Sequence, residues 1–301
     1  MKARSPGKLV LSGSYSVLWG APAIVTAVDR FATADRDRAA IHVAEEVVAA
    51  VELGLVPAPC FVDAGPLRTD AGNGTTRKLG LGSSAAILLA TMVAWNGEPR
   101  TGEERSSLFE NALAAHRKAQ GGGSGIDVAA STFGGTCRFV IAGSKPDVTP
   151  IALPSDLSIA VFAATTSAVT SGFVAKVRAL AASRPSDFDP LMAAASQGAR
   201  AAVEATAASE LCAALAKQRD ALATVGSLAG VPIVTEEVAV LARAASAEGA
   251  FFGPSGAGGG DVAFFASHRP PSSSFVAEAR HAGYDLLDCR IGAEGAREIP
   301  R

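Results

Sequence analysis

The stretch KLGLGSSAAILLA, from Lys78 to Ala90, joins a glycine-rich turn to a run of helix-forming residues. Gly80 and Gly82 allow the backbone of this turn to approach a ligand closely. The second half contains neither Gly nor Pro, which predicts a helix that begins at Ser83 or Ser84. Because the first N–H groups of a helix lack internal partners and lie at the positive end of its dipole, the stretch predicts an anion site.

The same residues also fit a flexible loop before a buried helix, so this stretch alone does not decide its function. No Gly-Lys-Ser/Thr sequence closes the loop, which excludes a Walker A loop. Ala85 stands where the third Gly of a dinucleotide fingerprint would stand, and no acidic residue follows at a suitable distance. Two further glycine-rich stretches, each with its own charged residue, favour the phosphate-site interpretation.

The composition predicts a soluble globular protein. At 301 residues, with 49% hydrophobic residues and a net charge of −2, the chain is long enough for two domains. The balanced charge and the scarcity of Trp and Tyr, two of each, argue against nucleic acid as a partner. The four cysteines form no C-x-x-C pair and the four histidines no metal-binding cluster, so we expect reduced thiols and no structural zinc. Without a signal peptide or membrane span, we expect a cytoplasmic protein.

Another motif lies near the N-terminus, in RSPGKLVLSGSYSVLWGAPAIVTAVDRF, residues 4–31. Two short apolar runs, Leu9–Leu11 and Ala23–Val28, flank a turn-rich middle, which predicts a strand, a turn and a second strand. Lys8 stands at the start of the first strand, where a lone Lys is usually a solvated charge.

A further motif, GSGIDVAASTFGG, runs from Gly123 to Gly135. It follows a predicted amphipathic helix over residues 103–119. Its glycines position one carboxylate, that of Asp127, on a tight turn before a short helix. Asp127 is a candidate general base, because a hydroxyl that attacks phosphorus must lose its proton. An Asp in this position is otherwise an ordinary helix-dipole partner. His116, near the end of the preceding helix, is interpreted as a charge partner of the helix terminus.

The remaining segments are scaffold in this interpretation. We expect strands, or a strand and a short helix, over 32–63, a loop over 64–77, a buried strand over 157–164, and Ala-rich helices over 188–225 and 235–248. A third glycine-rich stretch, FFGPSGAGGGDVAFFAS from Phe251 to Ser267, predicts a loop followed by a strand, and residues 284–290 a final strand.

Taken together, these motifs resemble those of the GHMP kinases, the superfamily of galactokinase, homoserine kinase, mevalonate kinase and phosphomevalonate kinase. The first motif of that superfamily, P-G-K-x-x-x-x-G-E-[HY]-x-V-x-x-G, is matched at Pro6, Gly7, Lys8, Gly13, Tyr15, Val17 and Gly20. The stretch at Lys78 is similar to the second motif, and P-S-G-A-G-G-G-D at 254–261 to the third. The variants at Tyr15, Lys78, His116 and Asp261 are most like those of phosphomevalonate kinases.

The resemblance implies an α+β fold with two domains, an N-terminal ATP-binding domain over 1–154 and a ferredoxin-like domain over 155–301. The first would be of the β-α-β type with a left-handed crossover. It also implies ATP and Mg²⁺ as cofactors, Lys8 and Asp127 as catalytic residues, and Ser84 as a Mg²⁺ ligand. The implied ATP-binding residues are Lys78, Gly80, Leu81, Gly82, Ser83, Ser84 and Ala85. The implied substrate-binding residues are Tyr15, Ser124, Gly125, Arg138, Ser167, Thr170, Ser255, Gly256, Ala257 and Gly258.

Two positions depart from the superfamily pattern: Ser14 replaces the usual Glu of the first motif, and Gly253 replaces a Lys before the third. The resemblance favours phosphorylation of 5-phosphomevalonate in the mevalonate route to isoprenoids. A mevalonate kinase or another small-alcohol kinase of the same superfamily is the first alternative, and a catalytically silent ligand sensor is the second. The expected partners are ATP and a small phosphorylated substrate, without a membrane or nucleic acid, in a monomer or homodimer.

Overall fold

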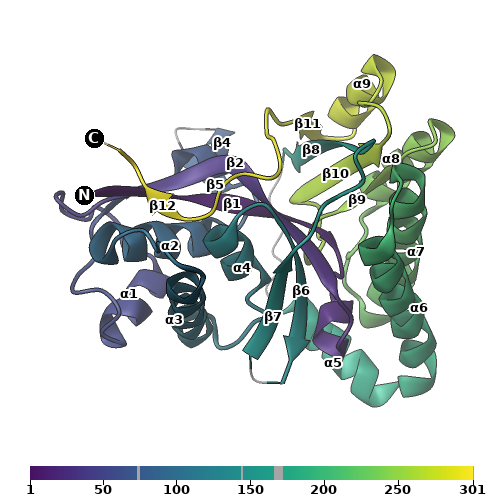
Figure 1. Ribbon diagram of the computed structural model, residues 1–301. Helices are drawn as coiled ribbons and strands as arrows, with labels where there is room; N and C mark the ends of the chain where they lie inside the picture. Colours follow the sequence, from purple (N-terminus) through teal and green to yellow (C-terminus); the bar gives the residue numbers. More distant parts are fainter. Residues whose placement is uncertain (73–74, 144, 166–171, 301) are drawn as a thin grey trace.

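The structure, a computed structural model, describes residues 1–72, 75–143, 145–165 and 172–300. Two antiparallel sheets form its framework, and helices cover them (Figure 1). The predicted substrate residues Ser167 and Thr170 lie outside the described residues.

The first sheet is built around the two long N-terminal strands that the sequence predicted. Its strand order is β12-β1-β2-β6-β7, and β3 also pairs with β2. A break in the register between Pro6 and Gly7 interrupts the pairing of β1 with β2 just before Lys8. The strands are β1 (Lys2–Ser12), β2 (Ala23–Asp35), β3 (Phe61–Asp63), β6 (Thr136–Ala142), β7 (Lys145–Pro150) and β12 (Arg297–Glu298).

Helices of the N-terminal half cover one face of this sheet (Figure 1). Helix α2 packs on β1 and β2 and is buried along most of its length, as its Ala/Leu-rich sequence requires. Helix α3 begins at a capping box formed by Thr101 and Glu104 and ends at Gly121, which adopts the left-handed conformation. The helices are α1 (Glu45–Glu52), α2 (Ser83–Asn96), α3 (Gly102–Gln120) and α4 (Ile126–Phe133), with a 3-10 turn η1 (Ser16–Trp19) between β1 and β2.

The second sheet has the strand order β11-β8-β10-β9, which is the order of a ferredoxin-like β-α-β-β-α-β unit. One face meets α7, and the other, rich in Phe, packs against α8 and α9. The strands are β8 (Ser158–Ala164), β9 (Phe251–Pro254), β10 (Val262–Ser267) and β11 (Tyr284–Leu286). The helices are α5 (Phe173–Ser183), α6 (Pro185–Glu204), α7 (Ala208–Ala229), α8 (Glu236–Ala247) and α9 (Ser273–His281).

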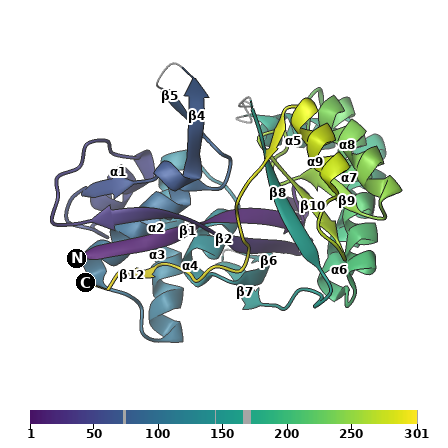
Figure 2. The same ribbon diagram turned by 90° about the horizontal axis from the view of Figure 1, so that it is seen from above.

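The prediction of a loop over residues 64–77 was wrong. A short 3-10 turn η2 (Gly65–Leu67) leads into a hairpin of β4 (Arg68–Gly72) and β5 (Thr75–Lys78), which projects from the body of the molecule (Figure 2). The Arg68 side chain donates to the Thr76 hydroxyl and carbonyl oxygens and so fastens the two strands. The tail also differs from the prediction, because residues 287–290 form no strand and the chain returns to the first sheet as β12.

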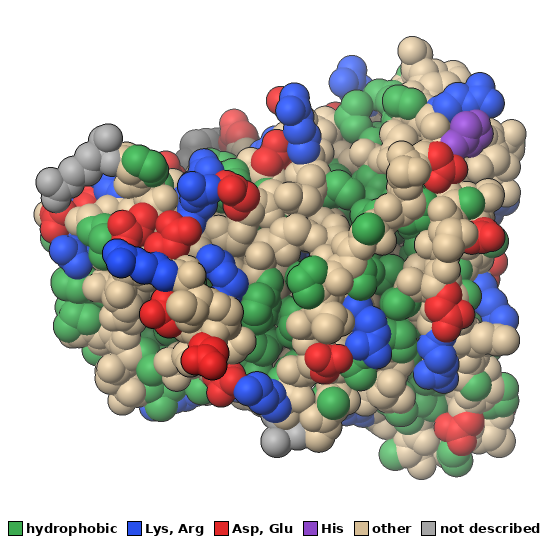
Figure 3. All heavy atoms as spheres, in the orientation of Figure 1, with side chains coloured by type: hydrophobic (Ala, Val, Ile, Leu, Met, Phe, Trp, Pro, Cys, Tyr) green, Lys and Arg blue, Asp and Glu red, His purple; other side chains and the backbone are tan. Residues whose placement is uncertain are grey.

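Charged side chains of both signs lie on the face of the molecule that Figure 3 shows. On the described part of the face in Figure 3, acidic and basic side chains are interspersed, and no broad region carries one sign. Among the described residues, no helix combines the length and the apolar character that a membrane crossing needs.

Candidate active site

A cleft of about 220 Å³ opens where β1 meets the beginnings of α2 and α4 and the end of α3. Its lining brings together residues from all three motifs of the N-terminal half. They are Lys8, Lys78, Gly80, Gly82, Ser83, Ser84, Gln120 and Asp127. The cleft therefore contains both predicted catalytic residues and most of the predicted phosphate-binding residues.

The first glycine loop, residues 80–84, forms one wall of the cleft. Gly80 and Gly82 have φ angles of 78° and 76°, which favour glycine. The Leu81 carbonyl accepts a hydrogen bond from the Lys8 backbone N–H at 2.8 Å, so the loop is fixed to β1. Helix α2 follows without a side-chain cap, and the N–H of Ala86 bonds to the Gly82 carbonyl at 3.2 Å. The N–H groups of the preceding first turn consequently have no partner within the helix and are available to an anion.

Lys8 lies across this loop. Its ammonium donates to the Gly80 carbonyl at 3.0 Å, and a Cβ at Gly82 would lie 2.9 Å from Lys8 Cγ. Partial burial removes the ammonium from bulk water and lowers the pKa of Lys8 below its ordinary value, while the charges of Asp127 and Asp261 act in the opposite direction. The cation is therefore held close to the predicted phosphate wall, with two carboxylates nearby.

Asp127 occupies the first turn of α4, close to the first glycine loop, since a Cβ at Gly82 would lie 3.6 Å from Asp127 Cβ. Gly125 makes the tight turn before it with a φ angle of 81°, and a Cβ there would lie 2.3 Å from Leu113 Cδ1. One carboxylate oxygen, Oδ1, accepts from the Val128 N–H at 3.0 Å. The side chain remains 22% exposed and lines the cleft.

His116 and Asp261 are site residues that the sequence analysis did not assign. His116 is 3% exposed, and its Nε2 lies 3.6 Å from Asp127 Oδ2, so the interpretation as a helix-terminus charge partner was wrong. The four-residue spacing of His116 and Gln120, which places both on one face of α3, was the available signal. Gln120 reaches the cleft and donates to the buried carboxylate of Glu46 at 2.8 Å.

Asp261 ends the second glycine loop, residues 255–260, and brings this loop to the first one. A Cβ at Gly80 would lie 3.1 Å from Asp261 Cβ, so the two loops touch. Gly256 also faces the site, since a Cβ there would lie 3.8 Å from Lys8 Nζ. The contact joins the two sheets at the cleft.

The other predicted substrate residues of the second glycine loop form hydrogen bonds or close contacts with other segments of the chain. The Ser255 hydroxyl accepts from the Val10 N–H at 2.9 Å, and the Ala257 carbonyl accepts from the Tyr15 hydroxyl at 2.7 Å. A Cβ at Gly258 would lie 2.0 Å from the Ile233 carbonyl oxygen. These contacts fasten the loop to β1 and to the segment before α8.

The remaining predictions divide between the cleft and its surroundings. Ser124 and Gly125 form the turn directly before Asp127, where the Ser124 hydroxyl accepts from the Ile126 N–H at 3.4 Å. Leu81 and Ala85 are buried behind the first glycine loop. Arg138 does not line the cleft, because its guanidinium pairs with Asp147 on the neighbouring strand β7 at 3.0 Å.

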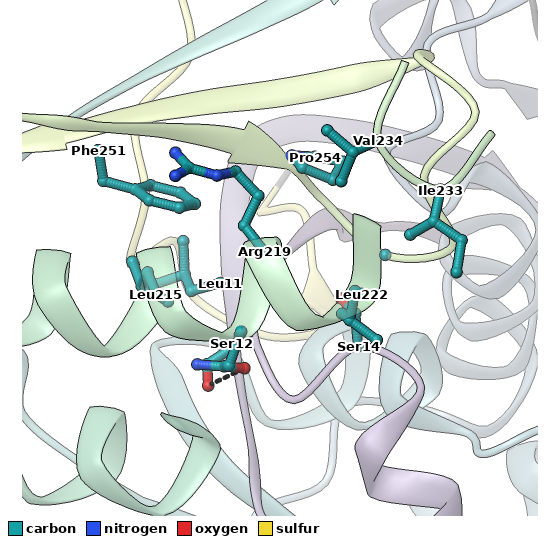
Figure 4. Close-up of a pocket in the computed structure, with 12 residues that line it drawn as sticks. Leu11, Ser12, Ser14, Leu215, Arg219, Leu222, Ile233, Val234, Phe251 and Pro254 are labelled. Carbon is teal, nitrogen blue, oxygen red and sulfur yellow. Dashed lines mark hydrogen bonds between the residues drawn. The ribbon is translucent and has the colours of Figure 1, made fainter. Parts of the chain in front are cut away.

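Of the two departures from the superfamily pattern, Ser14 lies beside a small hollow between β1, α7 and β9 (Figure 4), and Gly253 lies within β9. Ser14 borders this hollow, whose volume of about 30 Å³ is of the order of one water molecule. Gly253 has no space for a side chain, because a Cβ would lie 2.4 Å from the ring of Phe251. The Arg219 guanidinium stands 5.6 Å from the centre of that ring. The ring of Phe251 thus occupies the space that a side chain at position 253 would need.

The cleft residues fit the triphosphate and the ion that the resemblance implies. The uncapped first turn of α2 and the ammonium groups of Lys8 and Lys78 supply donors and positive charge for phosphate oxygens. Among the described residues, no group of three or more His, Cys, Asp or Glu is placed to hold a metal. Mg²⁺ is commonly bound through one or two protein oxygens and the substrate phosphates, and Ser84 and Asp127 offer such oxygens.

Comparison with known proteins agrees with this geometry. Residues 26–135 match the family described as GHMP kinases N terminal domain. This part of the chain is therefore similar in sequence to the N-terminal domain of GHMP kinases. The resemblance found in the sequence is thereby confirmed, and the matched region contains the first glycine loop, His116 and Asp127.

Relatives and solved structures extend the likeness to the whole chain. A mevalonate kinase from Archaeoglobus fulgidus is 28% identical over 299 residues, which cover 94% of this chain and 98% of the relative. The Lin0012 protein from Listeria innocua has a TM-score of 0.82 at 21% identity, covering 99% of both chains. Phosphomevalonate kinase from Streptococcus pneumoniae, solved with phosphomevalonate and AMPPNP, has a TM-score of 0.76 at 17% identity over 97% of this chain and 99% of its own. The expected α+β GHMP kinase fold is therefore confirmed.

Proposed function

We propose that this chain transfers the γ-phosphoryl group of ATP to 5-phosphomevalonate and forms 5-diphosphomevalonate. The observation that carries the proposal is the convergence of Lys8, Asp127 and the first glycine loop on one cleft. The similarity in fold to a kinase crystallised with phosphomevalonate and AMPPNP supports it. In this proposal, ATP and Mg²⁺ are the cofactors and a small phosphorylated molecule is the substrate.

Each wall of the cleft has a separate task in the proposed reaction. The N–H groups at the start of α2, together with Lys78, hold the phosphates of ATP. Lys8 stabilises the negative charge on the transferring phosphoryl group, and Asp127 faces the acceptor oxygen. Bound Mg²⁺ would neutralise phosphate charge. Catalysis is then mainly positioning and electrostatic stabilisation.

Whether Asp127 must act as a general base depends on the acceptor. A phosphate monoester has a second pKa near 6, so a phosphomevalonate oxygen is largely ionised at neutral pH. For this acceptor, Asp127 mainly orients the substrate and sustains the charge of Lys8, and its role as a base is small. A hydroxyl acceptor such as that of mevalonate keeps its proton until the transfer and therefore needs the base.

Mevalonate is the second candidate acceptor, because the Archaeoglobus fulgidus relative is a mevalonate kinase that matches almost the whole chain. Tyr15 and His116, two positions at which the chain is most like phosphomevalonate kinases, favour the phosphorylated acceptor in our proposal. A catalytically silent sensor would bind ATP without release of ADP in the presence of either acceptor.

The deciding experiment measures ADP release with ATP and Mg²⁺ in the presence of mevalonate or phosphomevalonate. We expect turnover with phosphomevalonate, and turnover with mevalonate alone would transfer the assignment to mevalonate kinase. ATP binding without turnover of either acceptor would support the alternative that the protein is a catalytically silent sensor.

The variant Asp127→Asn tests the role of the carboxylate, with Asp147→Asn, whose carboxylate pairs with Arg138 outside the cleft, as a control. Loss of a general base costs about 10²–10⁴-fold in rate. We therefore expect a loss of that size with a hydroxyl acceptor and a smaller one with a phosphate acceptor. Activity of Asp127→Asn or Asp127→Ala within threefold of wild type on every accepted substrate would remove Asp127 from the mechanism.

A further inference from the structure

A buried histidine stands behind the candidate base. His116 belongs to the last turns of α3, is 3% exposed, and directs Nε2 toward Asp127 Oδ2 at 3.6 Å. Gly123 lies next to this ring edge, since a Cβ there would lie 3.9 Å from Nε2, in ordinary contact. The imidazole and the carboxylate come from two different helices, α3 and α4, which are joined by the glycine-rich turn of residues 121–125.

Packing alone gives a poor reason for a histidine at this position. Within the described part of the chain, the second ring nitrogen, Nδ1, is buried and has no hydrogen-bond partner. A buried polar atom without a partner is unfavourable, and an apolar side chain of similar volume would avoid that cost. The other ring nitrogen, which faces the carboxylate, is therefore the group whose interaction explains the residue.

The carboxylate of Asp127 has two oxygens, and each faces a different donor. Oδ1 already accepts from the Val128 N–H at 3.0 Å, and Oδ2 faces His116 Nε2. A donor at each oxygen fixes the plane of a carboxylate as well as its position. The distance of 3.6 Å exceeds that of a normal hydrogen bond, and contacts of this kind in ligand-free active sites are often long and shorten when substrate binds.

We propose that His116 is a positioning residue for Asp127, an inference that rests on the proposed function. The Nε2–H group of the imidazole donates to Oδ2 and holds the carboxylate in the orientation that the acceptor and Lys8 require. His116 itself touches neither ATP nor the acceptor. Its loss therefore lowers the rate of transfer and leaves the affinity for ATP unchanged.

Two substitutions separate this role from packing. His116→Leu keeps an apolar side chain of moderate size without a donor, and His116→Gln restores an N–H group near the place of Nε2. We expect His116→Leu to lower kcat by about ten- to a hundredfold, the size of effect that follows from a misplaced catalytic group. The KM for ATP stays within twofold of wild type, and His116→Gln recovers kcat to within about threefold of wild type. Equal kcat values for His116→Leu and wild type, or equal losses in both variants, would overturn the proposal.

A spectroscopic readout tests the contact without activity. Nitrogen-15 NMR of the imidazole rings distinguishes the two neutral tautomers, and with four histidines in the chain His116→Gln identifies the signals of His116. We expect the Nε2–H tautomer in the wild-type protein and a change of these signals in Asp127→Ala. Signals unaltered by Asp127→Ala would refute the contact. If the wild-type protein turns over neither acceptor, the proposed function fails, while the tautomer experiment still supports or refutes the pairing.

Discussion

The two glycine-rich loops that meet at the cleft differ in what their polar groups do. Gly80 and Gly82 in the first loop, and Gly256 and Gly258 in the second, have positive φ angles between 76° and 81°. The first glycine loop runs into a helix whose first turn has no side-chain cap. The second runs into strand β10, and its groups are occupied: the Ser255 hydroxyl, the Ala257 carbonyl and the Gly259 N–H bond to other segments.

The difference shows that glycine density by itself does not identify a ligand site. In both loops, glycine allows a backbone shape that other residues adopt only with strain. In the described part of the chain, the first loop combines that shape with the start of a helix, whose first N–H groups have no partner within the helix. We therefore regard the first glycine loop as the phosphate site and the second as its support, with Gly256 as the part that faces Lys8.

The substitution Gly82→Ala should have the largest effect on activity. Its Cβ would lie 2.9 Å from Lys8 Cγ and 3.6 Å from Asp127 Cβ, so it displaces the catalytic pair and narrows the phosphate site. We expect a loss of more than about a hundredfold in kcat/KM, measured by ADP release. Gly20→Ala is the matched control, because Gly20 has a φ angle of 80° and no atom within 4 Å of its Cβ position. Equal activity losses in the two variants would show that backbone strain alone is responsible.

Gly258→Ala should act on stability instead. A Cβ at this position would lie 2.0 Å from the carbonyl oxygen of Ile233, and the φ angle of 81° is unfavourable for Ala. We expect the free energy of unfolding to fall by roughly 2–5 kcal/mol, measured by urea denaturation. Gly256→Ala has the same kind of φ angle and open space up to Lys8 Nζ, so it should cost only about 1–2 kcal/mol. Similar losses for both would mean that the second glycine loop is not fixed against Ile233.

The pH dependence of kcat/KM should reflect the protonation of the Lys8 ammonium. Partial burial lowers the pKa of this ammonium below 10.5, and the charges of Asp127 and Asp261 oppose the shift without cancelling it. Since the proposed reaction uses the charged form, kcat/KM should fall about tenfold per pH unit above that lowered pKa. In Lys8→Arg, the guanidinium keeps its charge, so whatever activity remains should lose this alkaline decline. A decline at the same pH in Lys8→Arg would assign it to another group.

Tyr15→Phe should have the smallest effect. It removes the hydrogen bond from the Tyr15 hydroxyl to the Ala257 carbonyl and leaves the ring in place. We expect a loss of about 0.5–1.5 kcal/mol in the free energy of unfolding, from urea denaturation, with little change in the KM for ATP. A large rise in the KM for the acceptor would instead support the prediction that Tyr15 binds substrate.

Sequence reasoning succeeded where a local pattern fixes local structure. The apolar runs around Leu9 and Ala23 gave β1 and β2, and the change from glycines to Ala and Leu after Gly82 located the start of α2. The hairpin of β4 and β5 was not predicted, because its residues are mostly small or polar and several are exposed. Its strands therefore show neither apolar alternation nor a run of core-facing residues.

The parts of the site that depend on packing between distant elements could not be predicted. The pairing of His116 with Asp127 follows from how the turn at 121–125 sets α4 against α3, which no periodicity in either helix indicates. The ion pair between Arg138 and Asp147 depends likewise on the register between β6 and β7. The domain division at 154 and 155 stays a prediction.

The return of the chain to its starting strand bears on any attempt to express the N-terminal unit alone. Glu298 pairs with Ala3 along the outer edge of β1, and the Ala296 N–H donates to the Ser131 carbonyl at 2.9 Å. A fragment cut at residue 154 would lack these contacts and would present β1 as a bare edge, which invites intermolecular strand pairing and aggregation. Supplying residues 287–300 as a separate peptide, or fusing them ahead of Met1 through a flexible linker, would restore that edge.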